Sequence, residues 1–203
     1  MIKNIVFDFG DIFINLDKEA TFVELAKLGV NEITDAMMMV AHQYEKGEVS
    51  TKDFIDFFYQ KFNISKTDLI NAWNAILLDF PKHRLEFLKA LESSRKYRLF
   101  LLSNTNDLHI TWIQNDWKNE LYSEFKNCFE QFYLSHEIGL RKPNADIYQF
   151  VLQENNLKAA ETFFIDDTLE NTLAAEELGI KTWNLIPGKE DVVDLLNRKE
   201  FIA

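Results

Sequence analysis

Residues 3–11 read KNIVFDFGD, and this stretch decides the fold class of the chain. Its apolar part is rich in β-forming residues and is closed by Gly10, which predicts a buried strand over residues 3–9. Asp8 stands at the end of this strand. Taken alone, Asp8 is compatible with a structural acid that caps the following turn. Whether it has a functional role depends on which other residues the fold places near it.

Four further apolar runs predict strands at residues 98–104, 129–135, 162–166 and 181–185. Helical patterns separate the last three runs. Strands that alternate with helices predict an α/β fold with a doubly wound, Rossmann-like parallel sheet. Pro143 suits the first position of one of these helices, with Lys142 just before it, and Gly179 suits the end of another.

The long stretch between the first two strands has only helical periodicity. We expect a helical-bundle cap at residues 17–90, inserted after the first strand, and a core domain formed by residues 1–16 and 91–203. The helical segments read KEATFVELAKL, EITDAMMMVAHQYEKG, TKDFIDFFYQKF and KTDLINAWNAILL. Phe54, Phe57, Phe58 and Phe62 recur at helical spacing, which is typical of core packing in a small bundle rather than of a ligand site.

Composition limits the possible partners. The 203 residues suffice for one core with an insert, and 47% hydrophobic residues supply a packed interior. A formal net charge of −11 without a basic patch argues against nucleic acid and anionic membranes, because both would be repelled. An anionic phosphate substrate would therefore need cations supplied by its own site: a metal ion, a lysine or helix N-termini.

The expected compartment is the cytoplasm. Cys128 is the one cysteine, so no internal disulfide can form, and its place in a predicted apolar strand favours a buried, inert thiol. The early apolar run ends at Phe9, which is too short for a signal peptide or a membrane span. The sequence leaves open whether the protein is a monomer or a homodimer.

Chemically active residue types follow the predicted strands. In an open parallel sheet, ligands bind beyond the carboxyl ends of the strands, so the residues there belong together. They are Asp8, Ser103, Asn104, Asp166 and Asp167, joined by Lys142 from the segment GLRKPNADIY. For Asn104, contact with substrate and shaping of the turn are equally compatible with the sequence. The four histidines form no metal-binding pattern, and Glu45 and Lys46 are expected to be solvated helix ends.

This set of residues suits phosphoryl transfer. Asp8 can attack phosphorus to form an aspartyl-phosphate, which divides one difficult displacement into two easier ones. Mg²⁺ prefers carboxylate oxygens, and Asp8 with Asp167, and Asp166 close by, can supply them. Lys142 can offset the remaining charge, while the Ser103 hydroxyl can donate to phosphoryl oxygens.

The segments VFDFGD, LLSN, GLRKPNADIY and FFIDD, in this order, resemble the motifs of the haloacid dehalogenase superfamily. The resemblance covers essentially the whole chain. It implies Asp8 as nucleophile, Ser103 as the phosphate-binding residue, Lys142 as the catalytic lysine of the family, and Asp166 and Asp167 as metal-binding acids, with a cap that closes over the substrate. Asn104 is a further candidate for phosphate binding beside Ser103 and Lys142. The segments KGEVS, AWNAIL and LLSNTND look most like the branch that contains a bacterial glucose-1-phosphate phosphatase and the N-terminal phosphatase domain of soluble epoxide hydrolase.

One position departs from the family pattern. Most such phosphatases carry an acid–base aspartate two residues after the nucleophile, whereas this chain has Gly10. The backbone carbonyl of Gly10 can still coordinate Mg²⁺, but proton transfer loses its usual group, which is typically worth about 10²- to 10⁴-fold in rate. Asp11 is a possible replacement, although adjacent residues generally point in different directions.

The sequence thus predicts a Mg²⁺-dependent phosphomonoesterase that acts on a small phosphorylated metabolite, with sugar phosphates among the candidates. Two alternatives stay open. A dehalogenase-type hydrolase would need no metal, but the acid pair near Asp8 argues against it, because like charges would raise the pKa of the nucleophile. A catalytically weak or inactive binding protein would account for Gly10.

Overall fold

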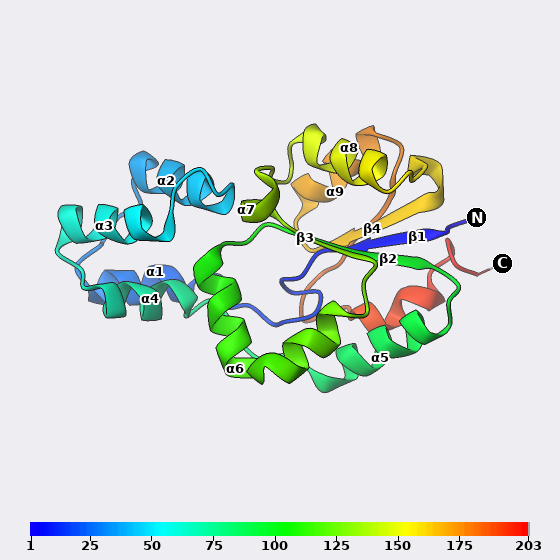
Figure 1. The fold of residues 1–203 in the computed structure, drawn as a ribbon, viewed down its shortest axis with the longest axis horizontal. Helices are drawn as coiled ribbons and strands as arrows, with labels where there is room; N and C mark the ends of the chain where they lie inside the picture. The colour runs from blue at the N-terminus through cyan, green and yellow to red at the C-terminus, as the bar shows by residue number, and fades with distance from the viewer. Residues whose placement is uncertain (203) are drawn as a thin grey trace.

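A five-stranded parallel sheet forms the centre of the computed structural model, which describes residues 1–202 apart from the side chains of residues 118 and 119 (Figure 1). Its strands are β1 (Asn4–Phe7), β2 (Arg98–Ser103), β3 (Gln131–Leu134), β4 (Thr162–Asp166) and β5 (Lys181–Asn184). They lie in the order β3-β2-β1-β4-β5, and every neighbouring pair is parallel. The predicted α/β class is confirmed.

Helices cover both faces of the sheet, and the three inner strands β1, β2 and β4 are buried almost along their whole length, as expected where neither face meets water. Ile5 and Phe7 of β1 point into the cluster beneath α5 (Lys82–Ser93) and α6 (Asp107–Lys126). Val6, between them, points into the opposite cluster beneath α8 (Ala145–Glu154) and α9 (Leu169–Glu177). The short helices are α7 (Ser135–Ile138), η1 (Ala159–Glu161) and η2 (Val192–Asn197).

Two details of the sequence prediction are wrong. Cys128 lies in the turn between α6 and β3 rather than in a strand, although it is buried as expected. Burial raises the pKa of its thiol to about 11, which keeps it protonated and unreactive. Pro143 is not the first residue of a helix, because α8 begins at Ala145 after the N-cap residue Asn144.

Four helices form a bundle beside the sheet, at the left of Figure 1. They are α1 (Ala20–Lys27), α2 (Asp35–Glu45), α3 (Thr51–Phe62) and α4 (Lys66–Asn74). Their buried residues form a separate apolar cluster that includes Leu25, Phe54, Phe58 and Leu69, as expected for core packing. Thr34, Ser50 and Ser65 cap α2, α3 and α4 with side-chain oxygens.

The division into a core of residues 1–16 and 91–203 and a cap of residues 17–90 remains a proposal. The separate cluster of the four-helix bundle supports it, but α5 packs differently from those helices. Leu85 and Leu88 of α5 join the cluster on the sheet, so the end of the cap is better placed before α5. Among the described residues, no helix has both the length and the apolar character that crossing a bilayer requires.

Candidate active site

The register of the sheet brings the predicted acids together. Because Phe7 pairs with Ile165, the next residues, Asp8 and Asp166, fall side by side at the carboxyl ends of β1 and β4. The backbone N–H of Asp8 continues the ladder by donating to the Ile165 carbonyl at 2.8 Å. Ser103 ends β2 on the other side of β1. Three adjacent strands therefore deliver polar side chains to one edge, as in other doubly wound sheets.

Lys142 connects two of these acids from a turn that precedes α8. Its Nζ donates to Asp8 Oδ1 and to Asp166 Oδ2, each at 2.6 Å, and the side chain is only 1% exposed. Burial alone would lower the pKa of Lys142, but Asp166 and Asp8 raise it above its ordinary value, so the group stays charged. Lys142 lies three residues before Ala145, the first residue of α8, and is therefore not part of the first turn of that helix.

Asn104 holds the backbone of Lys142 in place. Its Nδ2 donates to the Lys142 carbonyl at 2.9 Å, and its Oδ1 accepts from the Lys142 N–H at 2.9 Å. Of the two interpretations open for Asn104, these contacts support the one in which it shapes the local backbone. Ser103 is buried, and the nearest acceptor for its hydroxyl is the Asn104 carbonyl at 3.5 Å. Its predicted role in phosphate binding stays a prediction.

Asp8, Asp166 and Asp167 form a compact acidic cluster, in which one carboxylate oxygen from each lies within 4.8 Å of the others. Asp166 is fully buried and accepts from the Thr168 N–H at 2.8 Å and from Asn171 Nδ2 at 3.0 Å. Asp166 thus has partners inside the protein, and its contact with Lys142 indicates that it orients this lysine.

The charge balance of the cluster fits a divalent cation. Burial, together with Asp166 and Asp167, raises the pKa of Asp8 to about 7 despite the opposing effect of Lys142. Lys142 contacts Asp8 and Asp166, and Lys18 pairs with Asp167, so three carboxylates share two lysines and keep a net negative charge. Hard oxygen donors of this kind are the ones that Mg²⁺ prefers. Asp8, Gly10 and Asp167 line the same cavity, and the two carboxylates together with the Gly10 carbonyl could hold the ion.

The position of Gly10 is filled by a neighbouring side chain. A Cβ atom built on Gly10 would lie 2.6 Å from Leu16 Cδ1, so an acid–base side chain there requires the end of the Leu16 side chain to move. Asp11 has partners of its own, because its Oδ1 accepts from the Leu16 N–H at 3.0 Å and its Oδ2 lies 3.2 Å from Lys18 Nζ. A catalytic role of Asp11 in place of the missing group stays a prediction. Asp11, with a φ of 55°, stabilises the turn that leads to the cap.

A cavity of about 410 Å³ opens above these strand ends. Sequence reasoning missed several of its lining residues, among them the basic side chains of Lys18, His42 and Arg141. Arg141 stands beside Lys142 in the GLRKP segment, which was a usable signal, whereas no pattern distinguishes Lys18 or His42. Lys18 forms an ion pair with Asp167 and lies at the mouth of the acidic cluster. Arg141 Nε donates to Glu45 Oε2 at 3.2 Å, so the expectation that Glu45 is a solvated helix end is wrong.

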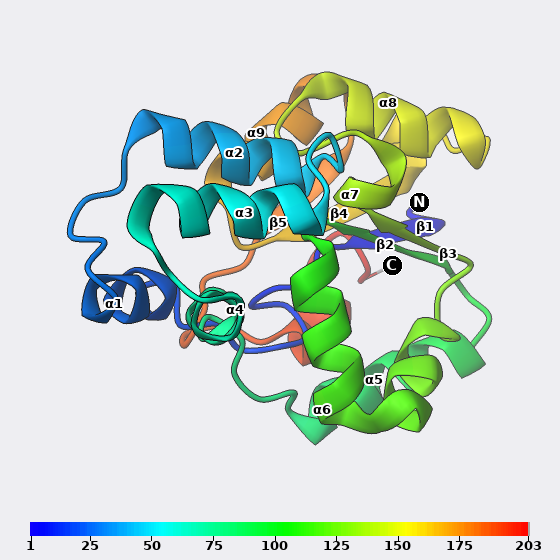
Figure 2. The ribbon, with the colours of Figure 1, turned by 60° about the vertical axis from the view of Figure 1, so that its left-hand side comes forward.

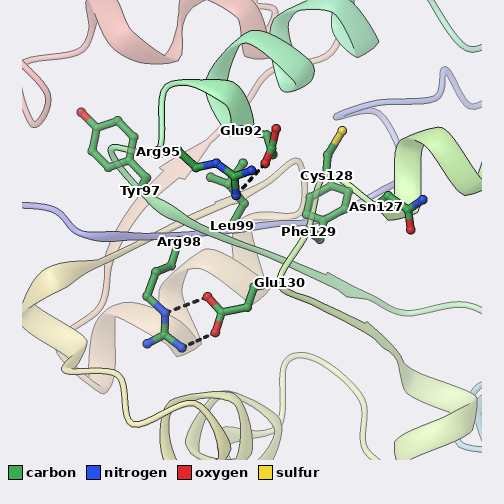
Figure 3. Close-up of a pocket in the computed structure, with 9 residues that line it drawn as sticks. All are labelled: Glu92, Arg95, Tyr97, Arg98, Leu99, Asn127, Cys128, Phe129 and Glu130. Carbon is green, nitrogen blue, oxygen red and sulfur yellow. Dashed lines mark hydrogen bonds and ion pairs between the residues drawn. The ribbon is translucent and has the colours of Figure 1, made fainter.

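A second hollow of about 350 Å³ lies at the opposite end of β2 (Figure 3). Arg98, at the start of this strand, is paired with Glu130, and Arg95 is paired with Glu92. The charges that line this hollow are thus already compensated, and it has no cluster of acids or buried cation comparable to that around Asp8.

A family model of haloacid dehalogenase-like hydrolases matches residues 2–179. The chain belongs to this family. A D-ribitol-5-phosphate phosphatase from Bacteroides thetaiotaomicron is 28% identical over 193 residues, which cover 90% of this chain and 91% of the relative. A glyceraldehyde 3-phosphate phosphatase from Methanocaldococcus jannaschii is 27% identical over 209 residues, with 93% and 87% covered.

Solved structures agree with this family assignment. The magnesium complex of a haloacid dehalogenase family enzyme from Bacteroides thetaiotaomicron superimposes with a TM-score of 0.86 at 34% identity, covering 97% of this chain and 99% of that one. These comparisons do not confirm the branch of the family that the segments KGEVS, AWNAIL and LLSNTND suggest, and membership of that branch stays a prediction.

Proposed function

We propose that this protein is a Mg²⁺-dependent phosphomonoesterase that hydrolyses a small phosphorylated metabolite through an aspartyl-phosphate on Asp8. The observation that carries the proposal is the buried Lys142, whose ammonium joins Asp8 and Asp166 inside a cluster of three acids. A nucleophilic carboxylate that faces a phosphate dianion needs this concentration of compensating positive charge.

The residues divide the work as follows. A carboxylate oxygen of Asp8 bonds to phosphorus while the bond from phosphorus to the ester oxygen breaks and that oxygen takes a proton from water. Lys142 stabilises the charge on Asp8 and on the phosphoryl group. Asp166, Thr168 and Asn171 keep Lys142 oriented through their hydrogen bonds. Mg²⁺ held by Asp8, Asp167 and the Gly10 carbonyl would supply further positive charge to the phosphoryl oxygens. Water then attacks phosphorus, releases phosphate and regenerates Asp8.

The substrate class follows from the cavity and from the relatives. Apart from Gly10, Leu16 and Pro143, the lining side chains of the 410 Å³ cavity are polar or charged. Such a lining suits a small hydroxylated leaving group, and two relatives are named for ribitol 5-phosphate and glyceraldehyde 3-phosphate. We infer a polyol or sugar phosphate. A cytoplasmic protein, either a monomer or a homodimer, remains the accompanying proposal.

The two alternatives are less well supported. A metal-free dehalogenase would rely on an Asp8 carboxylate whose pKa is raised by burial and further by Asp166 and Asp167, with no metal ion to offset this effect. The inactive binding protein has one observation in its favour: Leu16 occupies the place of the missing acid–base group. A polyol or sugar leaving group does not remove this difficulty, so a slow rate is expected.

The decisive experiment compares two neutralised aspartates. Asp8→Asn removes the nucleophile and should lower kcat by roughly 10⁴-fold or more. Asp11→Asn keeps an oxygen that can accept from the Leu16 N–H and should retain most of the activity. Phosphate release from a panel of metabolite phosphates with Mg²⁺ is the measurement, and EDTA should abolish turnover reversibly. Full activity of Asp8→Asn, or of the EDTA-treated protein, would sink the mechanism.

A further inference from the structure

The C-terminal end of α2 is one of the places where the cap contacts the core, and Figure 2 shows it beside α7. The hydroxyl of Tyr44 accepts from the Leu108 N–H at 3.1 Å, at the first turn of α6. Thr51, at the start of α3, donates to Asp107 Oδ2 at 2.8 Å and also contacts the Tyr44 hydroxyl at 3.0 Å. Hydrogen bonds thus tie both sides of the α2–α3 turn to α6.

Two more contacts act on the same segment. Glu45 Oε2 accepts from Arg141 Nε at 3.2 Å and lies 3.1 Å from a terminal guanidinium nitrogen of the same arginine. Gly47 packs so closely against α7 that a Cβ atom there would lie 2.2 Å from the His136 carbonyl oxygen. This end of α2 is therefore held in one position, which is a condition for precise recognition of a ligand.

His42 lies one helical turn before Glu45 and faces the cavity. Among the described residues of the four cap helices, it alone lines that cavity. Its ring is half-buried and makes no hydrogen bond to any other residue in the described part of the chain. By contrast, both ring nitrogens of His109 have partners, Asn106 and Trp73. An imidazole held in this way has donor and acceptor capacity to offer to a ligand.

We propose that His42 determines substrate specificity by hydrogen bonding to a hydroxyl group of the leaving group, and that the Glu45–Arg141 ion pair positions it. The inference rests on the proposed phosphatase function and deepens it. When the phosphoryl group lies at Asp8 and Lys142, the rest of the substrate extends into the same cavity, which His42 of the cap also lines. A polyol or sugar hydroxyl satisfies the imidazole, whereas an apolar leaving group leaves it buried without a partner, which is unfavourable.

The test measures selectivity, defined as the ratio of kcat/KM for a hydroxylated substrate to kcat/KM for p-nitrophenyl phosphate. The hydroxylated substrate is the best of ribitol 5-phosphate, glyceraldehyde 3-phosphate and glucose 1-phosphate. His42→Ala should lower this ratio roughly tenfold, the usual effect of one lost hydrogen bond, mainly through KM. His42→Gln should restore part of it. Met39→Ala, at a 57% exposed position of the same helix, is the matched control and should leave the ratio unchanged.

The outcomes separate the two levels of the proposal. An unchanged ratio in His42→Ala, whether both activities persist or both fall together, overturns the specificity role. A parent enzyme that prefers p-nitrophenyl phosphate to all three hydroxylated substrates overturns the leaving-group class. A parent without activity on any phosphate in the presence of Mg²⁺ refutes the proposed function itself.

A double-mutant comparison tests the positioning role of the ion pair. Glu45→Gln should lower the selectivity ratio severalfold in the parent, through KM rather than kcat, because α2 loses a charged contact to the core. In the His42→Ala background the same change should have almost no further effect on the ratio, because the group that it positions is gone. Equal effects in both backgrounds would show that Glu45 acts independently of His42.

Discussion

At the scale of single residues, the site is defined by what surrounds Asp8. Lys142 reaches Asp8 and Asp166 with one ammonium group, and the side chain of Asn104 fixes the backbone of that lysine. The site lacks a proton-transfer side chain at Gly10, and the end of the Leu16 side chain lies next to this position. Replacing the missing acid is therefore a question of space as well as of chemistry.

Gly10→Asp tests this point. Because the new side chain would be directed at Leu16 Cδ1, we expect little gain in kcat from the single substitution and a loss of stability of about 1 kcal/mol. Adding Leu16→Ala opens the space, and the double variant should gain in kcat by up to about 10²-fold, the lower end of general acid–base catalysis. Steady-state kinetics and urea unfolding give the two readouts; a full gain from Gly10→Asp alone would show that Leu16 does not obstruct the position.

At the scale of secondary-structure elements, the turn between α2 and α3 determines how the cap meets the core. Gly47 has a φ of 67° and stands against the carbonyl of His136 in α7. Both features call for glycine, since a side chain would be strained by the backbone conformation and would also collide with backbone atoms that have little freedom to move. Close approach of α2 to α7 follows from this single residue.

Gly47→Ala should therefore destabilise the protein more than a glycine replacement with backbone strain alone. Gly29, at the end of α1, is the matched control because it has a φ of 93° and no atom within 4 Å of an added Cβ. We expect Gly29→Ala to cost about 1 kcal/mol and Gly47→Ala about 1–3 kcal/mol more, together with a raised KM. Urea denaturation and substrate saturation curves are the measurements; equal losses in the two variants would argue against a tight contact at Gly47.

At the scale of the whole molecule, the cap and the core meet around the N-terminal turn of α6. Leu108 belongs to the apolar cluster of the cap although it lies on a core helix. Next to it, His109 stacks on Trp73 of α4 with ring centroids 5.8 Å apart, and its Nε2–H donates to the Trp73 carbonyl at 3.3 Å. Its Nδ1 accepts from Asn106 Nδ2 at 3.2 Å, so the neutral imidazole is satisfied at this junction.

Because His109 is buried at this junction, we expect the protein to lose stability in acid. Burial, with a smaller effect of His136, lowers the pKa of His109 from 6.5 to about 4, so between these values the unfolded chain binds a proton that the folded protein does not. The contribution is fully present above pH 6.5 and is lost as the pH falls towards 4, amounting to up to about 3 kcal/mol of unfolding free energy. His109→Gln should flatten this part of the curve of unfolding free energy against pH; an unchanged slope would assign the acid sensitivity to other groups.

The α/β class, the helical insert and the principal acids and lysine can be predicted from the amino-acid sequence, because strand periodicity and the order of motifs are local properties of the chain. Asp8, Asp166 and Lys142 were found for this reason, and the structure brings them within hydrogen-bonding distance.

The surroundings of these residues depend on the three-dimensional packing of the chain. Leu16 filling the place beside Gly10, Asn104 holding Lys142, and His42 facing the cavity from the cap all depend on contacts between separate elements. Such contacts have no periodicity and no fixed spacing along the chain, since they arise when independently formed elements pack together. Even the start of the helix after Lys142 was misplaced, because the backbone of that turn is set by Asn104 rather than by Pro143 alone.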